Sequence, residues 1–236
     1  MNGLLCLYKP AGITSYDCIR HLKRILPKKT KIGHGGTLDP FAEGLLVIGI
    51  GKGTKQLNDL LGATKTYVVT AKLGELTDTL DLTGSIIEHQ PIPEGFNFYA
   101  CAQKLMPSYE QTPPIFSSIK LNGTSLHKLA RTASLSHEEL EKVTESRKKV
   151  CTIFDFHMLG EEPPFVSFSA TVSKGTYIRS LALDIARQGK TVATVHALKR
   201  SAIGNLCLED AVKLENLTNC DDIIAHFLKK ALHLSN

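Results

Sequence analysis

A glycine-rich stretch around Asp39 contains the residues of this sequence that are best suited to chemistry. Seven of the 18 glycines lie between residues 33 and 53, in the text KIGHGGTLDPFAEGLLVIGIGKGTK. Asp39 is followed by Pro40, which has no N–H donor and confines the aspartate to an extended conformation. A carboxylate in such a loop can act as a nucleophile or a base, or can simply close the turn. His34 is open to the same two interpretations, catalytic or structural.

The glycines do not fit the patterns that bind nucleotide phosphates. G-x-x-x-x-G-K-[ST] would need glycine in place of Leu46 and serine or threonine in place of Gly53, and G-x-G-x-x-G would need glycine in place of Thr54. A nucleotide-hydrolysing enzyme is therefore disfavoured. Asp78 and Asp81 could be the paired carboxylates of a glycosidase, but a polar turn is the simpler interpretation.

Basic residues cluster just before the glycine-rich stretch. The segment from Arg20 to Lys31 holds six of them and no acidic residue: Arg20, Lys23, Arg24, Lys28, Lys29 and Lys31. On a helix and its following loop they would form a basic ridge, either a solvated face or a surface that contacts nucleic-acid phosphates. The candidate phosphate contacts within this ridge are Lys23, Arg24, Lys28 and Lys29.

The composition is that of an ordinary folded protein. The chain has 236 residues, 42% of them hydrophobic and 22% charged, with a formal net charge of +5. Disordered, collagen-like and membrane classes are disfavoured, and no apolar run reaches the roughly 20 residues of a membrane span. The N-terminus lacks the features of a signal peptide, and the six cysteines have neither C-x-x-C nor histidine-cluster spacing. We therefore expect a cytoplasmic protein with free thiols, no metal site and no disulfide framework.

The elements that must position these residues follow from apolar periodicity. We expect strands at 4–7, 45–50, 67–73 and 166–172, and helices at 19–26 and 178–185, with Thr14 or Ser15 capping the first. A last helix is predicted to start near Asp221 and to carry Ile224, Phe227, Leu228 and Leu232. The irregular mixture of strands and helices predicts an α+β fold with a mixed, mostly antiparallel sheet.

Several blocks of this sequence match the motifs of one enzyme family. The longest surrounds Asp39: Gly33 to Pro40, then Ala42, Gly44, Leu46, Gly51, Thr54 and Lys55. Others are Lys9-Pro10 with Gly12, Thr14 and Ser15; Lys65 and Tyr67; Thr77, Thr79, Asp81 and Gly84; Gln111, Pro113, Pro114, Ser117, Lys120, Gly123, Ala130 and Arg131; Ser173 and Gly175 to Leu181; and Leu198, Arg200 and Gly204. Together they cover residues 4 to about 208, and in this order they resemble the motifs of the TruB-type tRNA pseudouridine synthases.

The resemblance implies a fold, a reaction and a set of site residues. The fold would be that of the pseudouridine synthases, with a mixed sheet, flanking helices and a central catalytic cleft. The reaction would be isomerisation of the T-loop uridine of tRNA (uridine-55), without cofactor or metal. Asp39 matches the catalytic aspartate, Tyr67 the tyrosine that stacks on the flipped base, and Arg179 the arginine that pairs with the aspartate. His34 matches a histidine beside the T-loop, and Tyr177 and Leu198 match residues that line the base pocket.

Three classes of function remain open at this stage: the tRNA-modifying isomerase, a non-catalytic tRNA-binding or tRNA-folding protein on the same scaffold, and a sugar-phosphate or nucleotide enzyme. The isomerase is favoured because Asp39, Tyr67 and Arg179 are all present and a phosphate loop is not. Whether the carboxylate attacks C1′ or C6, or acts as a base at C2′, stays open. The expected partner is the T arm of tRNA, with no membrane and no protein partner, and we expect a monomer.

The resemblance also predicts how the chain is divided. Residues 1–208 would form the catalytic domain, with an inserted RNA-binding lobe at about 106–149 that is rich in proline, serine and charge. Residues 209–236 would form a short helical extension, without the PUA-type RNA-binding domain that bacterial relatives usually carry. The chain departs from the family at Tyr8, Phe116, Ser118 and His127, and these differences concern RNA contacts more than chemistry.

Overall fold

A computed structural model describes residues 1–228 of the chain, in two compact units. Unit 1 comprises residues 1–68, 169–174 and 197 onward, and unit 2 comprises residues 69–168 and 175–196. Three strands belong partly to each unit: β4 (Lys65–Leu73), β11 (Phe165–Val172) and β12 (Ala193–Ile203). The predicted boundary of the catalytic domain at residue 208 stays a prediction.

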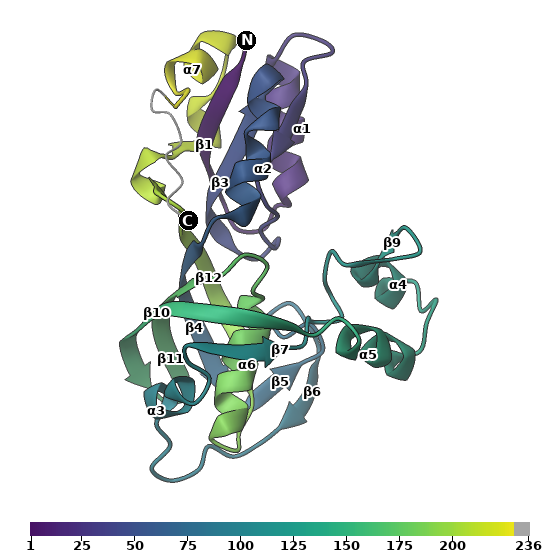
Figure 1. Ribbon diagram of the computed structural model, residues 1–236, viewed down its shortest axis with the longest axis vertical. Coiled ribbons are helices and arrows are strands. Elements are labelled where there is room, and N and C mark those ends of the chain that lie inside the picture. Colours follow the sequence, from purple (N-terminus) through teal and green to yellow (C-terminus); the bar gives the residue numbers. More distant parts are fainter. Residues whose placement is uncertain (229–236) are drawn as a thin grey trace. The chain divides into compact units, whose positions relative to one another are not determined.

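Unit 1 is built on a mixed sheet (Figure 1). Its strands, besides the shared ones, are β1 (Gly3–Lys9), β2 (Ile32–His34), β3 (Glu43–Ile50), β13 (Leu206–Cys207) and β14 (Val212–Lys213). β1 pairs antiparallel with β3 and parallel with β14, while β12 pairs parallel with β3. The helices are α1 (Ser15–Ile25), α2 (Leu57–Gly62) and α7 (Cys220–Ala225), with short 3₁₀ turns at Gly51–Lys55, Leu208–Asp210 and Leu214–Asn216. The predicted mixed sheet is confirmed.

The period-two pattern of β1 and β3 divides the core of unit 1 between two faces. Leu5 and Leu7 pack with the α1 residues Cys18, Ile19 and Leu22. Leu4 and Cys6, which point to the other face, pack with Leu57 and Leu60 of α2. Helix α1 begins where predicted, because the side chains of Thr14 and Asp17 form a capping box at its N-terminus. Helices α1 and α2 therefore cover opposite faces of the β1–β3 pair.

The predicted C-terminal helix is only partly correct. α7 ends at Ala225, so Ile224 lies in the helix but Phe227 and Leu228 do not. Phe227 instead forms an isolated antiparallel bridge with Leu5, and its ring lies against Gly3. The apolar spacing of these residues thus reflects contact with β1 rather than a helix face. Leu232 lies outside the described residues.

Unit 2 contains the remaining elements. Its strands are β5 (Glu75–Thr77), β6 (Ile86–His89), β7 (Ser108–Gln111), β8 (Lys120–Leu121), β9 (Thr124–Ser125) and β10 (Lys149–Glu162). Its helices are α3 (Phe98–Gln103), α4 (Leu126–Arg131), α5 (His137–Glu145) and α6 (Ile178–Gln188). β7 pairs antiparallel with β10, and the sheet continues through β11 to β4. The ring centroids of Phe98 and Phe156 lie 5.4 and 5.0 Å from that of Phe168, which places an aromatic core in this unit.

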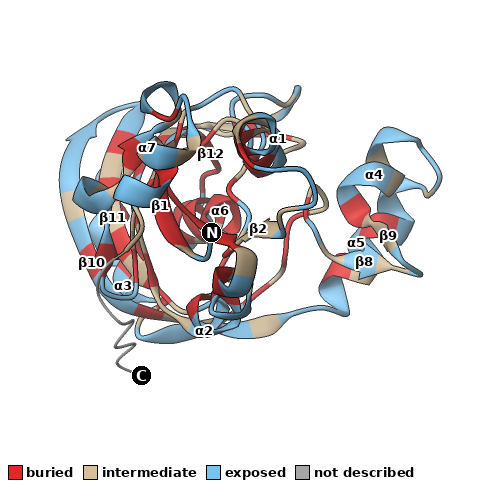
Figure 2. Ribbon diagram, turned by 90° about the horizontal axis from the view of Figure 1, so that it is seen from above, coloured by how far each residue is buried: buried red, intermediate tan, exposed pale blue. Residues whose placement is uncertain are grey.

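Residues 112–148 are inserted between β7 and β10 and carry β8, β9, α4 and α5. Most residues of α4 and α5 are exposed, whereas α6 is largely buried (Figure 2). Each of the six cysteines, all within residues 1–228, is free; four are buried, Cys220 is half-buried and Cys207 is exposed. Within the described part of the chain, no helix is long and apolar enough to cross a membrane.

Candidate active site

Asp39 lies in unit 1, in the loop that joins β2 to β3, and several main-chain bonds fix this loop. The side chain of Ser15 accepts a hydrogen bond from the N–H of Leu38 at 2.9 Å and donates one to its carbonyl at 3.1 Å. The N–H of Gly12 donates to the carbonyl of Pro40 at 2.8 Å, and the N–H of Ala42 donates to that of Asp39 at 3.1 Å. The half-buried aspartate therefore stands on a loop that the start of α1 holds in place.

Two buried cations also hold this loop by its carbonyl oxygens. Lys9 is fully buried, and its Nζ donates to the carbonyls of Pro10, Ile13 and Pro40 at 2.9, 2.7 and 3.2 Å. Arg200 is 1% exposed, and its guanidinium donates to three carbonyls: Leu45 at 2.8 Å, Thr37 at 3.3 Å and Gly36 at 3.2 Å. A charged donor that bonds several carbonyls is satisfied without a carboxylate partner.

Burial governs the electrostatics around the loop. It lowers the pKa of Lys9 to about 8, an effect that the negative charges of Asp39 and Glu43 oppose and the positive charge of Arg200 reinforces. Burial also lowers the pKa of His34, and the positive charge of Arg200 acts in the same direction. Neutral His34 is thus favoured at neutral pH.

The other predicted residues of unit 1 lie on strands. His34 ends β2, and its buried Nδ1 has no hydrogen-bond partner among residues 1–228. Tyr67 lies on β4 and is 9% exposed, and Leu198 lies on β12 and is 5% exposed. An aromatic ring on a buried strand is a fixed surface, as stacking on a base requires.

Arg179 and Tyr177 belong to unit 2, at the start of α6. Arg179 is buried, and its two terminal nitrogens donate to the carbonyls of Thr79 and Phe116 at 2.6 and 2.8 Å. It also forms an ion pair with Asp81 at 3.6 Å. Asp81 in turn accepts hydrogen bonds from Thr79 and Thr83, so it belongs to a buried polar turn rather than to a glycosidase pair with Asp78. The predicted pairing of Arg179 with Asp39 stays a prediction.

The basic ridge occupies α1 and the loop that follows it. Lys23, Arg24, Lys28 and Lys29 are exposed, as a phosphate-binding surface requires. Arg20 is paired with Asp17, which precedes the segment, so its charge is compensated. The Nζ of Lys23 lies 5.9 Å from the ring centroid of Tyr16.

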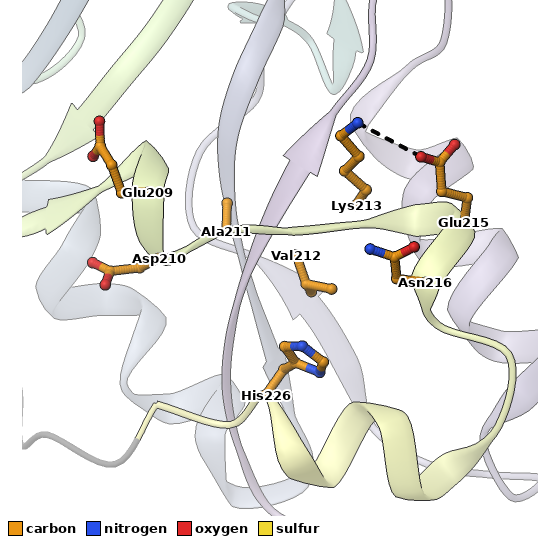
Figure 3. A pocket seen from close by; sticks show the side chains of 8 residues that line it. All are labelled: Glu209, Asp210, Ala211, Val212, Lys213, Glu215, Asn216 and His226. Carbon is orange, nitrogen blue, oxygen red and sulfur yellow. Dashed lines mark ion pairs between the residues drawn. The ribbon is translucent and has the colours of Figure 1, made fainter.

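A separate hollow of unit 1 contains none of the predicted site residues (Figure 3). Its lining comes from the chain around β14 and from the end of α7: Glu209, Asp210, Ala211, Val212, Lys213, Glu215, Asn216 and His226. Lys213 forms an ion pair with Glu215 at 3.7 Å on its rim. With three carboxylates and one lysine, this hollow is unsuited to a polyanion.

Comparison with known proteins decides the family. The family model described as "TruB family pseudouridylate synthase (N terminal domain)" matches residues 23–178, a range that includes Asp39, Tyr67 and Tyr177. The chain belongs to the TruB family. The predicted resemblance is therefore confirmed, and the mixed sheet described above is the TruB-family fold of this chain.

Individual TruB-family relatives agree over most of the chain. A protein of Clostridium novyi (strain NT) named tRNA pseudouridine synthase B is 40% identical over 227 residues, which cover 95% of this chain and 75% of the relative. One of the same name from Levilactobacillus brevis is 36% identical over 239 residues, covering 97% and 77%. A chain in the structure titled "Crystal Structure of a Cbf5-Nop10-Gar1 Complex" is 27% identical with a TM-score of 0.67, covering 91% of this chain and 53% of that one. This chain therefore spans about half the length of that solved chain.

Sequence patterns assigned no role to three residues that hold the site. Lys9, Arg200 and Gln111 occur in family blocks. Only the structure shows that they bond to main-chain groups of the segments that carry the candidate residues Asp39 and Tyr177. The available signal was a polar or charged residue within or at the end of an apolar strand. Such a residue is seldom buried without partners.

Proposed function

We propose that this protein is a tRNA pseudouridine synthase that isomerises the T-loop uridine, uridine-55, with Asp39 as the catalytic residue. Membership of the TruB family supports the reaction, and the relatives named tRNA pseudouridine synthase B support tRNA as the substrate. The observation that carries the assignment is the Asp39 loop, because buried Lys9 and Arg200 fix it by its carbonyls and leave the half-buried carboxylate on a rigid support. A positioned carboxylate is what attack on a ribose or uracil carbon needs.

The reaction breaks the N1–C1′ bond, turns the base over and joins C5 to C1′, and the C5 proton leaves as N1 gains one. Asp39 acts at C1′ or C6 as a nucleophile, or at C2′ as a base. Tyr67 stacks on the flipped uracil, which returns about 1–3 kcal/mol of the cost of unstacking. Arg179 pairs with the aspartate, and its planar fork suits a carboxylate better than a lysine would. His34 assists the removal of the uridine from the T-loop, and Tyr177 and Leu198 line the pocket.

We assign binding of the T arm to the basic ridge and the inserted segment 112–148. Lys23, Arg24, Lys28 and Lys29 are exposed cations, and contacts with phosphates make affinity depend on salt. If these three lysines and one arginine contact phosphates, their joint neutralisation flattens the salt dependence of tRNA binding and leaves the chemical step unchanged. An unchanged salt slope would make the ridge a solvated surface.

The test is conversion of an unmodified tRNA transcript, mapped by carbodiimide treatment and primer extension. The wild-type protein should give a single stop in the T-loop. Asp39→Asn should abolish conversion while tRNA binding stays within about tenfold, because phosphate contacts supply most of the affinity. Asp59→Asn, on the exposed face of α2, is the matched control and should behave as wild type. Binding without any stop in the wild type would leave a tRNA-binding protein without this activity.

A further inference from the structure

The turn that precedes α6 is attached to both ends of the inserted segment. Gln111 is the last residue of β7 and Lys149 the first of β10, and the two are opposite each other in the antiparallel register. The segment 112–148 therefore leaves and re-enters the sheet at one point. Both of these end residues contact the segment 175–179, which carries Tyr177 and Arg179.

Gln111 bonds to both main-chain polar groups of Tyr177, its N–H and its carbonyl. Its side chain is fully buried, its Oε1 accepts from the N–H of Tyr177 at 2.7 Å, and its Nε2 donates to the carbonyl of Tyr177 at 3.0 Å. One amide that pairs with the N–H and the C=O of a single residue replaces the bonds of a neighbouring strand. It thus fixes the backbone at the residue immediately before the helix.

A second connection joins β7 to a later part of α6. Nε2 of Gln111 also donates to the hydroxyl of Tyr109 at 2.6 Å, and the Tyr109 hydroxyl donates to the carboxyl group of Asp184. Asp184 lies on α6, and burial raises its pKa to about 6. Gln111 and Tyr109 therefore connect the end of β7 with both the start and a later turn of α6.

The ring of Tyr177 and the guanidinium of Arg179 have their own contacts with the base of the insertion. The Nζ of Lys149 donates to the carbonyl of Gly175 and lies 5.2 Å from the ring centroid of Tyr177. Gly175 has a φ of +74°, which a residue with a side chain adopts only with strain. The carbonyl of Phe116, within the insertion, accepts from Arg179.

We propose that Gln111 and Lys149 are positioning residues for the reaction: Gln111 fixes the backbone of Tyr177, Lys149 fixes its ring, and together they set the places of Tyr177 and Arg179. The proposal rests on the proposed function, because it assigns these two residues a part in a reaction on uridine. Loss of the amide frees the turn at 175–179, and a misplacement of about 1 Å lowers a rate by up to roughly a hundredfold.

The first test compares Gln111→Met with Gln103→Met, the same substitution at an exposed position of α3. With enzyme in saturating excess over tRNA, Gln111→Met should lower the single-turnover rate by at least about tenfold. Its tRNA dissociation constant should stay within a factor of about three. Amide hydrogen exchange in peptides that cover residues 175–179 should become faster. The Gln103→Met control should match wild type in all three measurements.

Two further comparisons separate positioning from stability and from RNA binding. Val166→Ala removes volume from the buried core of unit 2 and should lower the melting temperature without changing the single-turnover rate. Lys149→Met should lower that rate at saturating enzyme, and Lys149→Arg, which keeps the cation beside the ring, should restore it. These Lys149 variants also decide the matter if Gln111→Met does not fold.

Several results would overturn the proposal. The first is a Gln111→Met variant whose single-turnover rate and amide hydrogen exchange at 175–179 match the wild type. The second is a Val166→Ala variant that loses as much rate as Gln111→Met. The third is a rate loss in the Lys149 variants that disappears when the enzyme is in saturating excess. If the wild-type protein converts no uridine, the proposed function fails, and the exchange measurement still shows whether Gln111 fixes the turn.

Discussion

Replacement of Arg200 by methionine tests how the Asp39 loop is held. Methionine keeps much of the length of the arginine stem but has no donor for the carbonyls of Leu45, Thr37 and Gly36. A hydrogen bond from a charged group contributes about 1.5–3 kcal/mol. We assign about 2 kcal/mol to the 2.8 Å bond and about 1 kcal/mol to each of the two longer ones, since weak geometry lowers the contribution.

These contributions sum to about 4 kcal/mol. The expected loss of stability is smaller than this sum, because the variant avoids the desolvation cost of burying a guanidinium. We therefore expect Arg200→Met to lower the free energy of unfolding by about 3 kcal/mol, a large part of the roughly 5–15 kcal/mol of an ordinary domain. Urea unfolding followed by far-UV circular dichroism measures this change. The single-turnover rate should fall by at least about tenfold, because two of the lost bonds hold residues just before Asp39.

Lys199→Met is the matched control for this experiment. Lys199 is the neighbouring residue, and its side chain is 43% exposed and paired with Glu43 at 2.7 Å. A pair on the surface contributes at most about 1 kcal/mol, so the control should unfold close to wild type. If Arg200→Met also unfolds like wild type and keeps its rate, the loop is not held by this guanidinium and the reasoning fails.

Two more predictions follow from the same unit. The pKa of Lys9 falls from 10.5 to about 8 through burial, so between those values the unfolded chain binds a proton that the folded one has released. Stability should therefore rise with pH across that window, and Lys9→Met should remove about 1.4 kcal/mol per pH unit of this rise in urea unfolding from pH 8 to 10; an unchanged slope would contradict it. Gly44 has a φ of +112°, and a Cβ there would overlap the carbonyl of Arg200. Gly44→Ala should cost at least about 1–2 kcal/mol in chemical denaturation, whereas Gly62→Ala, which has open space and ordinary backbone angles, should be neutral or slightly stabilising.

Local patterns predicted β1, β3, β4, β11, α1 and α6, because the apolar spacing within each of these segments indicates its element. The apolar spacing and capping residues of 14–26 are sufficient for α1, and the alternation of β4 matches its one buried face. The prediction failed at Phe227, because its apolar neighbour is Leu5, at the opposite end of the chain. Periodicity alone does not distinguish a residue on the apolar face of a helix from one that pairs with a distant strand.

The candidate site divides in the same way. Asp39, Tyr67 and Arg179 were proposed because the family motifs surround them in the sequence. The roles of Lys9, Arg200 and Gln111 depend on partners 31, 163 and 66 residues away, to which no short motif refers. A contact of that kind exists only once the strands are paired, so the structure was required to assign it.

The supports of the proposed active residues have one physical principle in common. Lys9 and Arg200 around Asp39, and Gln111 beside Tyr177, are buried polar side chains that bond to main-chain carbonyls or N–H groups rather than only to other side chains. Main-chain groups are present whatever residue occupies the loop, so the support tolerates substitution in the loops but not in the supporting side chains. A group that loses such a donor stays buried and unsatisfied, which costs about 1–3 kcal/mol. The positions whose replacement is most costly are therefore expected to lie on the strands that hold the Asp39 loop and the turn at 175–179.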